Sequence, residues 1–256
     1  MFNSKVFLAE FIGTFALTFI GVAAGMSGAG LVAVALAHGF TLAVFAYAYG
    51  HISGTHVNPA VTFGLALNGT VKWSEAVVYW IAQFAGATVA AFILYSISGD
   101  ISAGATVGSL TTTQAMQTGG MKIVLFAALI EALLTFFLMN TILHTAVAGN
   151  GGKFAGWAIG TTLAFAILAG GPLTGASLNP ARTFGPAIFS APSFANVYTY
   201  VIYLFGPLIG ATLAVIVYNF FNETPEVVEE QVVIEVVDAP AVKVRKPVAR
   251  KTTAKK

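Results

Sequence analysis

One short stretch occurs twice in this chain, and its repetition limits what the chain can fold into. Residues 53–64 are SGTHVNPAVTFG, and residues 174–185 are TGASLNPARTFG. Both copies hold Asn-Pro-Ala in the same frame, followed after one residue by Thr-Phe-Gly. The asparagines of the two motifs, Asn58 and Asn179, lie 121 positions apart (179 − 58).

A second pair of residues keeps the same separation. Glu10 and Glu131 are the only acidic residues deep inside apolar segments, and they too lie 121 positions apart (131 − 10). Two independent features with one offset indicate an internal duplication. We therefore expect two homologous halves, the first over about 5–97 and the second over about 121–221.

The composition places these halves in a membrane. The chain is 57% hydrophobic and 9% charged, with a mean hydropathy of +0.83, whereas a soluble domain carries roughly 25% charged residues. Residues 1–221 hold five basic and four acidic side chains, and the other thirteen charges lie in 222–256. We predict a membrane domain over 1–221 and a disordered, charged cytoplasmic tail over 222–256. The net charge of +2 gives no sign of a nucleic-acid partner.

The apolar stretches predict an all-α integral membrane fold. A spanning helix needs about 20 mostly apolar residues. Two shorter apolar stretches, about 59–68 and 180–190, follow the Asn-Pro-Ala motifs and should enter the membrane and return. Such backbone is tolerated only inside protein or beside a water-filled cavity. The expected fold has two of these re-entrant half-helices and six transmembrane helices, at about 5–25, 31–50, 75–97, 121–144, 154–170 and 196–221.

The number of spans in each half predicts an inverted repeat. Three spans are an odd number, so the second half starts from the opposite side of the membrane. Basic residues favour the cytoplasmic side. With both termini cytoplasmic, Lys5, Lys72 and Lys153 fall inside and Lys122 outside. Inverted repeats place the functional site near the midplane, where broken helices meet.

Asn-Pro-Ala is a good helix start. The asparagine side-chain oxygen can accept a hydrogen bond from a first-turn N–H, and proline suits the next position because its missing N–H would be unsatisfied anyway. The NH₂ group then points elsewhere. If Asn58-Pro59-Ala60 and Asn179-Pro180-Ala181 meet at mid-membrane, they present two donors and two positive helix ends to one point. A proton would meet an unfavourable potential there.

Arg182 follows the second motif directly, where the first copy has Val61. A charge at membrane depth costs about 2.5–3.5 kcal/mol on insertion scales and marks a functional site.

With these motifs in place, the chain resembles the aquaporin (major intrinsic protein) family over about residues 5–221. The stretches that carry the resemblance are AEFIGTF (9–15), GHISGTHVNPAVT (50–62) and TGASLNPARTFGP (174–186). The resemblance implies six tilted helices and two half-helices in a right-handed bundle, a pore in each subunit and a homotetramer. It implies a passive channel in the lipid bilayer of the plasma or inner membrane, which conducts water in single file and excludes protons and ions.

The resemblance also assigns roles to individual residues. It implies a narrow outer filter of His38, Ile167, Ala176 and Arg182, a set similar to the filters of plant vacuolar (tonoplast) members. Some of those members pass ammonia, urea or peroxide as well as water. Glycerol facilitators usually have Asp after the arginine; Thr183 stands there in this chain and makes glycerol a weaker candidate.

By the same resemblance, Glu10 and Glu131 support the two re-entrant loops by accepting hydrogen bonds from backbone N–H groups. They are support residues rather than catalytic acids, because they belong to opposite halves.

Other functions are judged by what the sequence lacks. There are no cysteines, which excludes disulfides and thiolate metal sites, and no metal-ligand cluster or nucleophile–base pair is apparent. We expect no enzyme activity, no cofactor and no metal. Two alternatives stay open: a channel of the same fold mainly for ammonia, urea or glycerol, and a secondary transporter, which also uses inverted repeats. The transporter is disfavoured because no intramembrane acidic cluster is present to couple ions.

Overall fold

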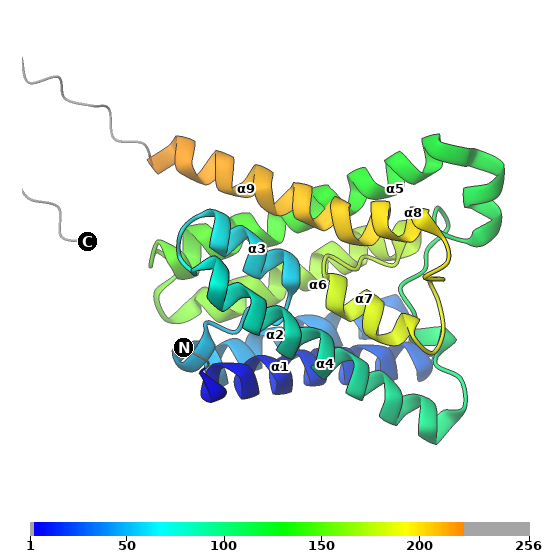
Figure 1. Cartoon of the computed structure of the whole chain (residues 1–256), viewed down its shortest axis with the longest axis horizontal. Helices are drawn as coiled ribbons and strands as arrows, with labels where there is room; N and C mark the ends of the chain where they lie inside the picture. The colour runs from blue at the N-terminus through cyan, green and yellow to red at the C-terminus, as the bar shows by residue number, and fades with distance from the viewer. Residues whose placement is uncertain (1–2, 223–256) are drawn as a thin grey trace, which may run out of the picture. The chain divides into compact units, whose positions relative to one another are not determined.

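The computed structural model describes residues 3–222, and these form one helical membrane unit (Figure 1). The charged tail predicted for 222–256 lies outside the described residues, apart from Asn222 itself. Among the described residues 3–222, six helical segments are long and apolar enough to cross a membrane. They are α1 (Ser4–Met26), α2 (Gly30–Ser53), α4 (Trp73–Ser98), α5 (Thr113–Ile142), α6 (Ala155–Thr174) and a last segment that ends with α9 (Gly206–Asn222).

Capping residues begin and end these helices. The Asn3 side chain accepts hydrogen bonds from the backbone N–H groups of Lys5 and Val6, which starts α1. The helix α2 ends at Gly54, whose φ of 82° lies in the left-handed region that glycine adopts easily. α6 stops in the same way at Gly175, with φ of 80°.

The two half-helices form where the Asn-Pro-Ala motifs predict them. α3 (Pro59–Leu67) has 9 residues and α7 (Pro180–Ala187) has 8. At about 1.5 Å per residue each reaches less than half the thickness of a hydrocarbon core. Each has asparagine at its N-cap and proline in its first turn. In Figure 1, α3 lies toward the side where α1 begins and α9 ends, which we name the terminal side. α7 lies toward the side of residues 99–112, which we name the loop side.

Glycines let the long helices approach closely at equivalent places in the two halves. A Cβ on Gly39 of α2 would lie 2.6 Å from the carbonyl oxygen of Gly160 of α6, and a Cβ on Gly160 would overlap the oxygen of Gly39. Gly39 and Gly160 are separated by the repeat offset (160 − 39). The two helices therefore cross at residues that the internal symmetry relates, as expected for an inverted repeat whose backbones touch at small residues.

Several helix boundaries differ from the sequence-based expectation. α5 begins at Thr113, inside the loop 98–120 that the predicted spans 75–97 and 121–144 leave between them, because the Thr112 side chain accepts a hydrogen bond from the N–H of Ala115 (3.1 Å). Gly120, with φ of 56° and ψ of −150°, separates this leading segment from the span proper. The same loop also contains a short 3₁₀ turn, Ser102–Gly104.

The fifth and sixth spans differ as well. The fifth span was predicted to end near 170, but α6 continues to Thr174. The carbonyl groups of Pro172 and Leu173 are satisfied there by the N–H groups of Ser109 and Leu110, both at 2.9 Å. The last span is continuous but irregular: α8 (Val197–Tyr200), a π-helical turn (Val201–Phe205) and then α9. The second half-helix ends at Ala187 rather than near 190.

Candidate functional site

The two Asn-Pro-Ala motifs meet tip to tip. The Asn58 side-chain NH₂ donates to the carbonyl oxygen of Leu178, and that of Asn179 donates to the carbonyl oxygen of Val57, both at 2.8 Å. Their side-chain oxygens accept from the N–H of Ala60 (2.9 Å) and of Arg182 (3.2 Å), so each asparagine also caps its own half-helix. An amide NH₂ carries two donors, so each asparagine keeps one N–H beyond the one given to the opposite half.

The backbone in front of each motif is strained in the same way. Thr55 and Val57 have φ of 50° and 43°, and their counterparts Ala176 and Leu178 have φ of 42° and 56°. Residues other than glycine adopt such values rarely, and the strain must be held by the surroundings. Because three of the four residues before each asparagine have a positive φ, the segment cannot form a helix or strand of its own, and its polar groups need partners elsewhere.

Glu10 supplies those partners for the first segment. Its carboxylate accepts from the N–H of His56 (2.9 Å), the N–H of Val57 (2.7 Å) and the hydroxyl of Ser53 (2.7 Å). Gln83 adds a further donor at 2.8 Å.

Glu131 has equivalent contacts in the second half. It accepts from the N–H of Ser177 (3.0 Å), the N–H of Leu178 (2.8 Å) and the hydroxyl of Thr174 (2.7 Å). Both glutamates are fully buried. A buried carboxylate is tolerated only when it is well hydrogen-bonded, and here the bonds also fix the strained backbone.

Arg182 and His38 lie together on the loop side of the two motifs. The Arg182 Nε donates to the His38 Nε2 at 3.3 Å. The His38 Nδ1 lies 2.8 Å from the carbonyl oxygen of Val34, which can only accept, so Nδ1 carries the proton and Nε2 is free to accept. A Cβ at Gly21 would overlap the imidazole, so glycine at that position makes room for the ring.

Thr106 is the site residue that the sequence analysis missed. Its hydroxyl accepts a hydrogen bond from the Arg182 guanidinium and lies 3.3 Å from the hydroxyl of Thr183. The Tyr203 hydroxyl lies 3.0 Å from the Thr106 carbonyl oxygen and fixes the loop there. The sequence offers only a high content of Gly, Ser and Thr over 98–120, and that pattern is equally typical of any exposed loop.

The other two predicted filter residues are buried nearby. Ile167 is 2% exposed and Ala176 is 1% exposed, and both belong to the same apolar cluster as Leu178 and Val57. The structure therefore joins Arg182 by hydrogen bonds to His38 and to Thr106, whereas Ile167 and Ala176 are buried in the apolar cluster.

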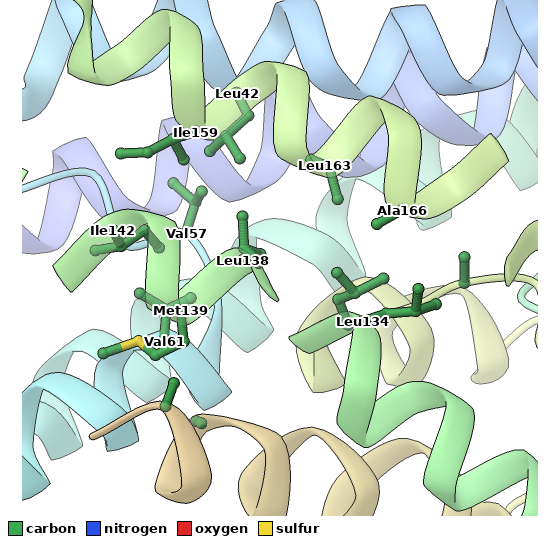
Figure 2. Close-up of a cluster of buried hydrophobic side chains, with 14 of the residues drawn as sticks. Leu42, Val57, Val61, Leu134, Leu138, Met139, Ile142, Ile159, Leu163 and Ala166 are labelled. Carbon is green, nitrogen blue, oxygen red and sulfur yellow. The ribbon is translucent and has the colours of Figure 1, made fainter. Parts of the chain in front are cut away.

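A narrow cavity of about 50 Å³ is lined by the two motif asparagines and by two of the proposed filter residues. His38 and Arg182 line its loop side, and Asn58 and Asn179 line its middle. Toward the terminal side its walls become aliphatic, as Figure 2 shows for side chains of α2, α5 and α6 that face one another. A wider vestibule of about 580 Å³ follows on the terminal side. A chain of small polar molecules can be held here by amide and carbonyl groups, whereas residues 3–222 contain no cluster of His, Asp or Glu able to hold a metal ion.

Comparison with known proteins identifies the family. The family described as Major intrinsic protein matches residues 1–218. The chain belongs to the major intrinsic protein family. As a member it is a passive membrane channel and not an enzyme, which agrees with the sequence-based prediction.

The relatives include channels named for different solutes. The chain is 39% identical over 237 residues to Aquaporin TIP2-1 of Arabidopsis thaliana, covering 87% of this chain and 89% of the relative. It is 40% identical over 213 residues to Glycerol uptake facilitator protein-like 6 of Lactiplantibacillus plantarum, covering 82% of this chain and 94% of that protein.

A solved structure supports the fold of this major intrinsic protein. The aquaglyceroporin from Plasmodium falciparum aligns with a TM-score of 0.69 and 25% identity, over 84% of this chain and 95% of that one. The all-α fold with six membrane-crossing segments is therefore confirmed.

Proposed function

We propose that this channel conducts water in single file and excludes protons and ions. The observation that carries the proposal is the reciprocal contact of Asn58 and Asn179. Each amide is fixed by the opposite half and has one N–H left to offer beside the narrow cavity.

This geometry opposes proton transfer along a chain of water. A molecule between the asparagines accepts from both amides and faces the positive ends of α3 and α7, so its own hydrogens point away on either side. Water can then pass, while a proton meets donors and positive potential. Arg182 adds a fixed positive charge on the loop side, which raises the barrier for cations.

We propose that His38, Ile167, Ala176 and Arg182 form the filter and that Thr106 is part of the same wall. The contacts of Arg182 with His38 and Thr106 hold the guanidinium to one side, where it can donate to a passing molecule without filling the opening. Glu10 and Glu131 act as loop supports.

A second candidate is passage of small neutral solutes such as ammonia, urea or glycerol. Two observations favour keeping it. The proposed filter residue Ile167 is a buried aliphatic side chain rather than a polar one, and the relatives include both an aquaporin and a protein named as a glycerol uptake facilitator.

For the assembly we propose a homotetramer in the plasma or inner membrane, with both termini cytoplasmic and residues 222–256 forming a separate tail. The family supports the tetramer, and the basic residues Lys5, Lys72 and Lys153 support the orientation. The terminal side would then face the cytoplasm. Cross-linking in membranes and protease accessibility of the tail in sealed vesicles test these two points.

Purified protein in liposomes tests the function. After an osmotic jump in stopped flow, the vesicles should shrink much faster than protein-free vesicles, with a low activation energy. A pH dye inside the vesicles should report no added proton leak under an imposed potential. Shrinkage no faster than in empty vesicles would refute the proposal, and a saturable flux coupled to an ion gradient would identify a transporter instead.

A further inference from the structure

The internal repeat relates the filter to a second set of residues on the terminal side. Subtracting or adding the offset of 121 pairs His38 with Ile159, Arg182 with Val61 and Gly21 with Ile142. The narrow cavity is lined by His38 and Arg182 toward one end and by Val61, Ile142 and Ile159 toward the other. His38, Arg182 and Gly21 thus each have an aliphatic counterpart on the terminal side.

We propose that Val61, Ile142 and Ile159 form a second selectivity element, an apolar collar, which acts on neutral solutes that carry several hydrogen-bonding groups. The inference rests on the proposed channel function and concerns its specificity. It differs from the filter because it discriminates through loss of hydration rather than through charge or hydrogen bonds.

The position of the collar supports this role. Ile142 and Ile159 line both the narrow cavity and the wider vestibule, so they stand where one opens into the other. Figure 2 shows Ile159 of α6 directed toward Val57 and Ile142. A solute that enters from the vestibule must therefore lose its surrounding water at the collar.

The packing explains why this end is apolar and narrow. In the filter, Gly21 leaves space that the His38 ring fills, and the ring meets the arginine through a hydrogen bond. At the related place Ile142 and Ile159 fill the space with aliphatic carbon. All three collar residues are at most 9% exposed and belong to one apolar cluster.

Hydrogen bonds at the collar are available on one wall only. The cavity there is bordered by the strained segment with Gly54, Thr55 and His56, whereas the opposite wall is aliphatic. A water molecule can keep bonds to that segment and to its neighbours in the file. Urea, with one carbonyl and two NH₂ groups, leaves more groups unpaired, and each unpaired polar group in an apolar environment raises the barrier.

Val61→Thr tests the collar, because threonine keeps nearly the same shape as valine and adds a hydroxyl. Urea-driven reswelling and osmotic shrinkage are measured on the same liposomes, and the result is the ratio of urea to water permeability. We expect this ratio to rise about tenfold, which corresponds to a barrier lower by ~1.4 kcal/mol. The control is Ile81→Thr. Ile81 lies on the outer face of α4 and is 58% exposed, so this change should leave the ratio unchanged.

A second variant separates the effect of the hydroxyl from a folding defect in Val61→Thr. Ile159→Thr places a hydroxyl on the opposite helix and should raise the ratio in the same direction, while water permeability shows that each variant is folded. If both folded variants keep the wild-type ratio, the collar is refuted while the channel function stands. If the wild type itself moves no water, the channel proposal fails, and that result is distinct from the first.

Discussion

At the scale of single residues, the site depends on which nitrogen of His38 carries a proton. The bond from Nδ1 to the Val34 carbonyl leaves Nε2 as an acceptor, so the imidazole can receive the Arg182 Nε–H. A histidine that donated at both nitrogens would turn an N–H toward the guanidinium instead. One backbone carbonyl in α2 therefore sets the position of the filter charge.

Replacing His38 with alanine should widen the filter and free the guanidinium. We expect the ratio of urea to water permeability to rise by about tenfold or more. Loss of one side-chain contact in a selective pocket typically changes discrimination between two solutes by that factor. Reswelling of liposomes measures this ratio. His51→Ala, at an exposed histidine of the same helix, is the control. An unchanged ratio would mean that His38 does not border the path.

Replacing Glu131 with glutamine should destabilise the second loop. The amide can accept through one oxygen only, so its NH₂ group would face the N–H of either Ser177 or Leu178, both of which bond to the carboxylate. A buried donor left without a partner costs about 1–3 kcal/mol. Thermal unfolding in detergent should show a lower midpoint, whereas Glu75→Gln at an exposed site should not. Equal midpoints for Glu131→Gln and wild type would contradict the support role.

At the scale of elements, the sequence predicted most of the structural features that the internal repeat produces. The half-helices, the matched glutamates and the six spans follow from motif spacing and hydropathy, because caps and apolar length are local properties. The start of α5 was missed because Thr112 is one polar residue in a polar loop and only its hydrogen bond to Ala115 reveals a cap. Thr106 was missed because its contact with Arg182 joins residues far apart in the chain.

The crossing of α2 and α6 should not tolerate a larger side chain. A Cβ on Gly160 would lie 2.7 Å from the Cβ of Ala43 and would overlap the Gly39 oxygen, so Gly160→Val must force the helices apart. Overpacking of this kind typically costs about 1–3 kcal/mol. Gly50→Val is the control, since nothing lies within 4 Å of a Cβ there. Detergent thermostability should fall for the first variant only; a fall of equal size in both would show that this crossing has no special role.

At the scale of the whole molecule, residues 3–222 contain the fold and the candidate site together. The family match ends at residue 218, and every contact of the filter, the motifs and the loop supports lies before it. We therefore expect a chain ending at Asn222 to conduct water as fast per channel as the full chain. Stopped-flow shrinkage normalised to the amount of reconstituted protein measures this. A large loss of flux in the shortened protein would show that the tail is required for conduction.

Single introduced cysteines can locate the path that water takes through the molecule. The chain has no cysteine of its own, so mercury, which blocks through thiolates, should leave wild-type water flux unchanged. A cysteine at Leu42, which lines the narrow cavity, should make the channel sensitive, because a bound metal ion would fill the path. Val44→Cys, two residues along the same helix and 60% exposed on its outer face, should bind mercury without loss of flux. Block at both positions, or at neither, would mean that water does not follow the cavity between the two half-helices.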